Sequence, residues 1–229
     1  MRKFEGDLFQ ELWDGTYTQV ERPRFEILKK IAEEISIEKI EGDIVECGIW
    51  RGGVVIYMSY LFPEKTIWGL DSFDGFQNIE DAVFKYDGHE RHTHDFDAHN
   101  PMSVRGGYSI KIDEEHVKQN IRTFGLEPDK DIKLIKGFVR DTTNPQNCPI
   151  EKIALLRIDV DAYSATLETL TNLYDKVVPG GYIVFDDIPL YECQDAIKEF
   201  KKMREIEFEL IGDSQQSGYY GGCYLKKQI

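Results

Sequence analysis

Two short apolar runs that end in acidic residues constrain the fold of this chain more than any other feature of its sequence. The first run ends at Asp159 and Asp161, and the second ends at the adjacent pair Asp186 and Asp187. Short runs of aliphatic and β-branched residues are typical of buried parallel strands. In doubly wound α/β sheets, the carboxyl ends of such strands line the crevice that binds ligands. We therefore expect these acids to lie together in a ligand site.

Repulsion between these carboxylates indicates that a cation lies among them. The sequence separation of Asp159 and Asp186 suits one strand–helix–strand unit, which would bring the two strand ends side by side. Adjacent acids after a buried run are costly without a counter-charge, and Mg²⁺ prefers oxygen ligands. The alternative is that these acids are loop and capping residues in water, which suits Asp161 because a helix is expected to start directly after it. A divalent metal site is the favoured interpretation.

The remaining elements predict an α/β fold. Helical periodicity occurs at 23–37, 51–61, 113–124, 162–176 and 195–204, between strand-like runs at 44–48, 66–71, 132–137, 153–159 and 182–185. This alternation predicts a mostly parallel sheet with helices on both faces. Two late runs, 208–211 and 219–225, predict an antiparallel pair at the C-terminal edge and a sheet of seven strands.

The chain of 229 residues suits a single domain, residues 1–229. We expect an N-terminal helical extension at 1–40, whose first 20 residues lack regular periodicity. A long insert at about 73–112 also lacks periodicity, and inserts of this length often cover a substrate. It holds His89, His92, His94 and His99, whose spacing matches no zinc motif.

Charge and cysteine content limit the partners and the compartment. The formal net charge of −14 disfavours nucleic acid as a partner, and no apolar stretch is long enough for a membrane span. The four cysteines lack a CxxC spacing, which favours a reducing, cytoplasmic setting. We expect a small-molecule substrate and leave open whether the chain forms a homo-oligomer.

A glycine-containing loop follows the first predicted strand and precedes a helix. It reads Glu46-Cys-Gly-Ile-Trp-Arg-Gly-Gly, with Trp50 where a dinucleotide loop has glycine, so S-adenosylmethionine is favoured over NAD. Asp71 ends the next strand, where a carboxylate can bind the ribose hydroxyls of an adenosine ligand. The alternative is that Asp71 only caps the turn that follows it.

Five segments in this order resemble the macrocin O-methyltransferase family. They are VECGIWRGG, GLDSFDGF, KGFVRDT, LLRIDVDAYSATLETLTNLYDKVVPGGYIVFDD and the Ile-Pro that follows. The resemblance covers about residues 42–76 and 134–200. It implies a Rossmann-like class I methyltransferase fold and methylation of a sugar hydroxyl that depends on S-adenosylmethionine and a metal ion. The sugar could belong to a nucleotide sugar, an antibiotic glycoside or a surface polysaccharide.

The resemblance also implies a role for each matching residue. The cofactor-binding positions are those of the loop, the ribose-binding acid and the adenine pocket: Glu46, Gly48, Asp71, Ser72, Gly137 and Phe138. The three metal ligands, expected to hold Mg²⁺, are Asp159, Asp186 and Asp187, and Asp159 is also the implied general base.

Other activities remain as alternatives. A catechol-type O-methyltransferase usually has Asp-Asn as its last ligand pair and a lysine soon after the first Asp, whereas this chain has Asp186-Asp187 and no lysine at 160–164. An NAD-dependent nucleotide-sugar enzyme is disfavoured by the missing G-x-G motif. A non-catalytic domain that binds S-adenosylmethionine would be expected to have lost a metal ligand.

Overall fold

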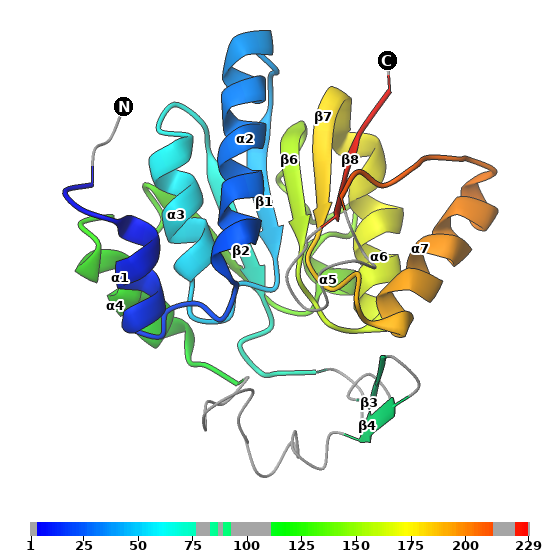
Figure 1. The fold of residues 1–229 in the computed structure, drawn as a ribbon, viewed down its shortest axis with the longest axis horizontal. Helices are drawn as coiled ribbons and strands as arrows, with labels where there is room; N and C mark the ends of the chain where they lie inside the picture. Colours follow the sequence, from blue (N-terminus) through cyan, green and yellow to red (C-terminus); the bar gives the residue numbers. More distant parts are fainter. Residues whose placement is uncertain (1–3, 77–82, 87–88, 93–110, 213–222, 229) are drawn as a thin grey trace.

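The fold is taken from a computed structural model, which describes residues 4–76, 83–86, 89–92, 111–212 and 223–228. In this part of the chain six strands form one sheet in the order β5-β2-β1-β6-β7-β8 (Figure 1). All neighbours are parallel except β7 and β8, which are antiparallel. The strands are β1 (Asp43–Cys47), β2 (Ile67–Asp71), β5 (Ile132–Lys136), β6 (Ile153–Ile158), β7 (Val177–Phe185) and β8 (Cys223–Lys226).

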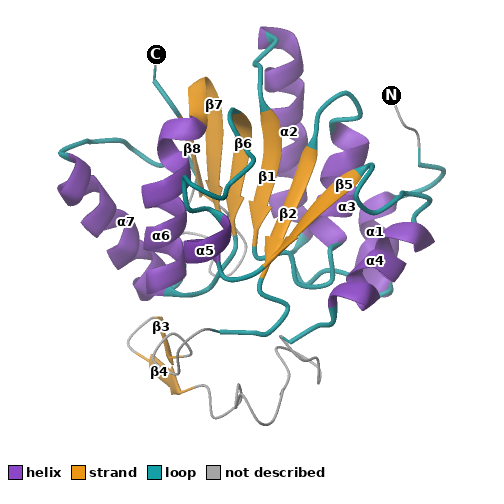
Figure 2. Ribbon diagram, turned by 180° about the vertical axis from the view of Figure 1, so that it is seen from behind, coloured by secondary structure: helices purple, strands orange, loops and turns teal. Residues whose placement is uncertain are grey.

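Helices cover both faces of this sheet, as Figures 1 and 2 show from opposite sides. One face carries α1 (Leu8–Asp14), α2 (Arg22–Glu38), α3 (Gly53–Leu61) and α4 (Glu114–Thr123). The other carries α5 (Val139–Thr142), α6 (Tyr163–Leu173), the 3₁₀ turn η3 (Tyr174–Lys176) and α7 (Tyr191–Arg204). The predicted α/β class, with a mostly parallel sheet and an antiparallel C-terminal edge, is confirmed.

Each face of the sheet has its own hydrophobic core. Successive residues of a strand point to opposite faces, so Ile44 and Leu155 pack under α2 and α3, whereas Val45 and Leu156 pack under α6 and α7. All four side chains are fully buried. This alternation explains why strands buried on both sides are continuously apolar in the sequence.

Three boundaries differ from the prediction. The first 20 residues contain a helix, α1, because Asp7 caps it by accepting a hydrogen bond from the Gln10 N–H and because Leu8 and Leu12 are buried on one side. Strand β7 begins at Val177 rather than at Tyr182, since its pairing with β6 continues through a register shift. Helix α7 begins at Tyr191, earlier than predicted.

The prediction of seven strands is wrong for the described residues, where the main sheet has six. Residues 208–211 do not form a strand, although Ile211 makes an isolated antiparallel bridge with Tyr224. Of the predicted run at 219–225, the described part lies in β8, which pairs with β7 instead. Residues 213–222 are outside the described chain.

Much of the predicted insert at about 73–112 lies outside the described residues, including His94 and His99. Within it, β3 (Val83–Tyr86) and β4 (His89–His92) form an antiparallel hairpin. This hairpin lies beyond the carboxyl ends of the parallel strands (Figure 1). Among the described residues, no helix has both the length and the apolar character that crossing a membrane requires.

The direction of chain progression reverses between β1 and β6. From β1 the chain runs outward through β2 and β5, then returns to β6 on the other side of β1 and runs outward through β7. Ligands of open α/β sheets bind outside the carboxyl ends at such a switch point. The crevice between the ends of β1 and β6 is therefore the place to look for a site.

Gly48, directly after β1, is required by the close approach of these two strand ends. Its φ is +84°, and a Cβ atom added there would lie 1.6 Å from the carbonyl oxygen of Asp159. No side chain fits in this space. Gly125 also has a positive φ, +69°, but a Cβ atom there would meet nothing within 4 Å.

We expect Gly48→Ala to lower the free energy of unfolding by about 3 kcal/mol or more, because the clash with the backbone adds to the strain of a positive φ. The matched control, Gly125→Ala, should cost only about 1–2 kcal/mol, the strain alone. Urea unfolding of both variants measures the difference. Equal losses would show that β1 and β6 do not approach each other this closely.

Candidate active site

Strand register places a set of charged side chains on one face of the sheet. Glu46 of β1 lies opposite Arg157 of β6, and Arg157 lies opposite Val184 of β7. Asp159 lies two positions after Arg157, and Asp186 lies two positions after Val184. Side chains two positions apart in a strand point to the same face, so both aspartates lie on the face of Arg157. This is the face that α2 covers, at the carboxyl ends of the strands.

The Arg157 guanidinium forms ion pairs with all three acids of this set. It binds Glu46, Asp186 and, at 2.7 Å, the Oδ2 atom of Asp159. The side chains of Arg157 and Glu46 are each only 1% exposed. The shared guanidinium group holds these acids in place, because breaking any of the ion pairs would leave a buried charge without its partner.

Burial raises the pKa of two of these acids, Glu46 and Asp159. It raises the pKa of Glu46 to about 8, although the Arg157 guanidinium acts in the opposite direction. Burial raises the pKa of Asp159 to about 7, again against the attraction of Arg157 and with the help of repulsion from Asp186. The Oε2 atom of Glu46 is buried without a hydrogen-bond partner. Glu46 and Asp159 therefore keep their protons to a higher pH than ordinary carboxyl groups do.

Three aspartates come together beside this ion-pair set. Carboxylate oxygens of Asp159, Asp161 and Asp187 lie within 4.8 Å of one another. Asp161 has a positive φ of 57°, and its backbone N–H donates to Oδ2 of Asp187 at 2.9 Å. Asp161 is not the cap of α6, because the N-cap position is Ala162. The capping interpretation of Asp161 is therefore wrong.

Asp186, one of the three predicted metal ligands, is held differently. Its Oδ1 atom accepts from Arg157, and its Oδ2 atom accepts from Arg24, in the first turn of α2. Asp159 and Asp187 thus belong to the aspartate cluster, whereas Asp186 is bound by two guanidinium groups. The predicted ligand set remains a prediction, and Asp161 is a further candidate.

Asp71 organises the loop that follows β1. Its Oδ2 atom accepts hydrogen bonds from the backbone N–H groups of Ile49 and Trp50, both at 2.9 Å, and its Oδ1 atom accepts from Phe73 at 2.8 Å. Burial raises the pKa of Asp71, although these backbone donors lower it. The turn-capping role is observed, and ribose binding by Asp71 remains a prediction.

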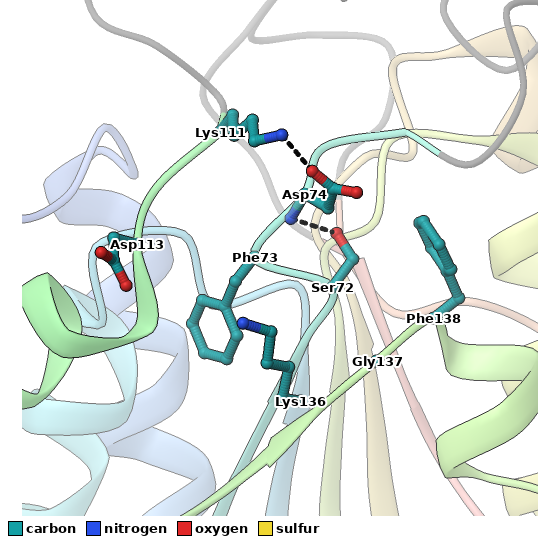
Figure 3. Close-up of a pocket in the computed structure, with 8 residues that line it drawn as sticks. All are labelled: Ser72, Phe73, Asp74, Lys111, Asp113, Lys136, Gly137 and Phe138. Carbon is teal, nitrogen blue, oxygen red and sulfur yellow. Dashed lines mark hydrogen bonds and ion pairs between the residues drawn. The ribbon is translucent and has the colours of Figure 1, made fainter.

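A cavity of about 690 Å³ lies beside the ends of β2 and β5 (Figure 3). Three predicted cofactor residues, Ser72, Gly137 and Phe138, line it, together with Lys111 and Lys136. Ser72 accepts from the Asp74 backbone N–H at 3.1 Å, and Lys111 pairs with the Asp74 carboxylate. The sequence prediction thus grouped residues that the fold does bring together.

The N-terminal segment packs directly onto the glycine loop. The Gly53 N–H donates to the carbonyl oxygen of Tyr17 at 3.1 Å, and a Cβ atom on Gly53 would lie 2.5 Å from that oxygen. Arg51 donates to the carbonyl and the hydroxyl oxygen of Thr16. Gly53 therefore serves the packing of residues 16–18, and this segment forms one wall beside the loop.

Sequence reasoning missed the two arginines that bind the acids. Arg157 could have been found, because a single cation inside the buried run Ile153–Ile158, with acids directly after it, indicates a buried ion pair. Arg24 gives no such signal, since it is 162 positions from its partner Asp186.

Comparison with known proteins identifies the family of this chain. The family model described as macrocin-O-methyltransferase (TylF) matches residues 10–220. The chain belongs to the macrocin O-methyltransferase family. This confirms the resemblance proposed from the five sequence segments and the expected class, an S-adenosylmethionine-dependent O-methyltransferase.

Individual relatives agree with this family. Demethyldecarbamoylnovobiocin O-methyltransferase of Streptomyces niveus is 33% identical over 213 residues, which cover 90% of this chain and 76% of that protein. A Streptomyces olivaceus enzyme named 8-demethyl-8-(2,3-dimethoxy-alpha-L-rhamnosyl)-tetracenomycin-C 4'-O-methyltransferase is 28% identical over 190 residues, 81% of this chain and 67% of its own. The solved structure of the O-methyltransferase NovP matches with a TM-score of 0.75 and 30% identity, over 93% of this chain and 83% of that one.

We expect Arg157→Met to lower the free energy of unfolding of this methyltransferase by about 3–5 kcal/mol, because the buried acids lose their shared counter-charge. Arg204→Met is the matched control. Its ion pair with Asp175 is exposed, and its loss should cost at most about 1 kcal/mol. Chemical denaturation of both variants measures the two losses. A stable Arg157→Met protein would contradict the structural role of these buried ion pairs.

Proposed function

We propose that this methyltransferase transfers a methyl group from S-adenosylmethionine to a hydroxyl of a sugar-containing small molecule, with a divalent cation such as Mg²⁺ at the acceptor site. The observation that carries the proposal is the aspartate cluster Asp159, Asp161 and Asp187, which follows the ends of β6 and β7 beside the switch point between β1 and β6. It lies at the same end of the sheet as the cavity lined by predicted cofactor residues.

The cavity has the size and walls that a nucleoside ligand needs. Its volume of about 690 Å³ falls in the range of about 300–1,000 Å³ typical of ligand pockets. Phe138 and Ser72 line it (Figure 3). The Phe138 ring suits an aromatic contact with an adenosine, whereas the Ser72 hydroxyl donates to the Gly75 carbonyl and accepts from the Asp74 N–H. When bound, S-adenosylmethionine supplies the electrophilic methyl group. The other predicted cofactor residues, Glu46, Gly48 and Asp71, are not among those that line this cavity. Glu46 pairs with Arg157, Gly48 packs against Asp159, and Asp71 holds the loop after β1.

The aspartate cluster fits a hard dication. Ligand oxygens on opposite sides of a Mg²⁺ or Ca²⁺ ion are about 4–5 Å apart, twice the metal–oxygen distance. The cluster oxygens lie within 4.8 Å of one another. Among the described residues, five carboxyl groups face two guanidinium groups here, so a dication would offset most of the excess negative charge when the carboxyl groups are ionised. A bound metal ion would acidify the acceptor hydroxyl.

Asp159 is the proposed general base. It would accept the hydroxyl proton while the new O–C bond forms and the C–S bond of the sulfonium breaks. Arg157 fixes its Oδ2 atom, which keeps the carboxylate at the strand end. The Asp161 N–H orients Asp187 in the same way. Holding donor and acceptor in line can account for about 7–11 kcal/mol of the barrier at best.

A sugar is the proposed acceptor because of the family and its members. The Streptomyces olivaceus relative is named for a substrate that carries a rhamnosyl group. Neighbouring hydroxyls of a sugar ring can approach one metal ion together, as an all-oxygen site requires. Family membership also argues against the NAD-dependent and catechol-type alternatives.

Calorimetry with S-adenosylhomocysteine and Mg²⁺ tests both ligands. We expect micromolar binding of S-adenosylhomocysteine with or without EDTA, and methylation of an alkyl rhamnoside that stops when EDTA removes the metal. The reason is that the cavity and the aspartate cluster are separate sets of residues. Binding of NADH but not of S-adenosylhomocysteine, or preferential methylation of catechol, would overturn the proposal.

Asp187→Asn serves as the site variant in the same assay, with Asp195→Asn as its surface control, since Asp195 is exposed and pairs with Lys198. The site variant should lose methylation and keep S-adenosylhomocysteine binding, and the control should keep both. Unchanged methylation by Asp187→Asn would exclude the metal role of this residue.

A further inference from the structure

Arg24 joins helix α2 to the acids of the site. It lies in the first turn of α2. The side chain of Arg24 is 14% exposed, and that of its partner Asp186 is 4% exposed. The first turn of α2 lies at the end of the sheet to which the parallel strands point (Figure 1). An ion pair between segments so distant in sequence, and so little exposed, couples the position of α2 to the acidic site.

The same ion pair engages Asp186, a residue that the sequence predicts as a metal ligand. One oxygen of Asp186 binds Arg157 and the other binds Arg24, so each is engaged by a guanidinium group. The carboxylates of Asp159 and Asp187 attract Arg24 as well. Burial acts to lower the pKa of Arg24, but these attractions, led by that of Asp186, outweigh it.

The two arginines differ in how easily they could leave. Arg157 is on a central strand, is 1% exposed and binds acids from β1, β6 and β7. Arg24 reaches the site from the end of a helix, next to the connection that leads back to α1. A dication attracts a carboxylate with twice the Coulomb energy of a monocation at the same distance. Arg24 is therefore the cation that a metal ion would displace.

We propose that Arg24 is an exchangeable counter-cation, which holds Asp186 in the metal-free enzyme and releases it when the divalent ion binds. This inference rests on the proposed function, since it presupposes the metal. Loading the site would then free the first turn of α2. Residues 16–18 precede this turn and pack on the glycine loop. Their packing would therefore change when the turn is released. Metal binding would thus be coupled to the position of residues 16–18 beside the glycine loop.

Mn²⁺ titration of the full chain, saturated with S-adenosylhomocysteine, tests the exchange. Arg24→Gln should bind Mn²⁺ at least about tenfold more tightly than the wild type, because no guanidinium competes for Asp186. Arg22→Gln is the matched control, since Arg22 lies in the same helical turn and forms an exposed ion pair with Asp7. Its Mn²⁺ affinity should stay within about twofold of wild type.

Hydrogen–deuterium exchange of the wild-type protein gives a readout that needs no variant. Mg²⁺ should accelerate exchange in the first turn of α2 and leave α6 unchanged. Equal or weaker Mn²⁺ binding by Arg24→Gln, or slower exchange in α2 with Mg²⁺, would overturn the role of Arg24 and leave the proposed function intact. If the wild type binds S-adenosylhomocysteine but no Mn²⁺, the metal itself is refuted, and the exchange with it.

Discussion

The buried guanidinium group of Arg157 holds one carboxylate of β1 and those directly after β6 and β7, at the carboxyl end of the sheet. Without a shared cation these acids would repel one another or take up protons, and the strand ends could not approach as closely as Gly48 allows. The ion pairs do not balance the site, because further carboxylates of Asp161 and Asp187 lie beside them. This excess of carboxyl groups is the basis for the divalent cation that we propose.

Much of the architecture could be predicted from local pattern. Apolar runs that end in acids gave the central strands, because strands buried on both faces are continuously apolar and their carboxyl ends bind ligands. Ser72, Gly137 and Phe138 could be grouped in advance through motifs on neighbouring strands, and one cavity contains them. The fold class, the family and the methyltransferase activity followed from the order of such motifs.

What could not be predicted depends on contacts between distant segments. The sequence near Asp186 does not reveal that Arg24 binds it, because the contact exists only once α2 has packed on the sheet. Asp161 looked like a helix cap, but the backbone there turns through a positive φ and its N–H meets Asp187 instead. The expected seventh strand is reduced to the bridge between Ile211 and Tyr224, since β8 takes the edge of β7.

Anomalous diffraction from crystals grown with Mn²⁺ and S-adenosylhomocysteine would show whether the acids at the carboxyl ends of β6 and β7 bind a divalent metal ion. We expect one anomalous peak at about 2.0–2.6 Å from carboxylate oxygens of Asp159 and Asp187, with S-adenosylhomocysteine bound in the cavity at the ends of β2 and β5. Ordered S-adenosylhomocysteine with no peak at these aspartates, or with the peak at another part of the chain, would contradict it.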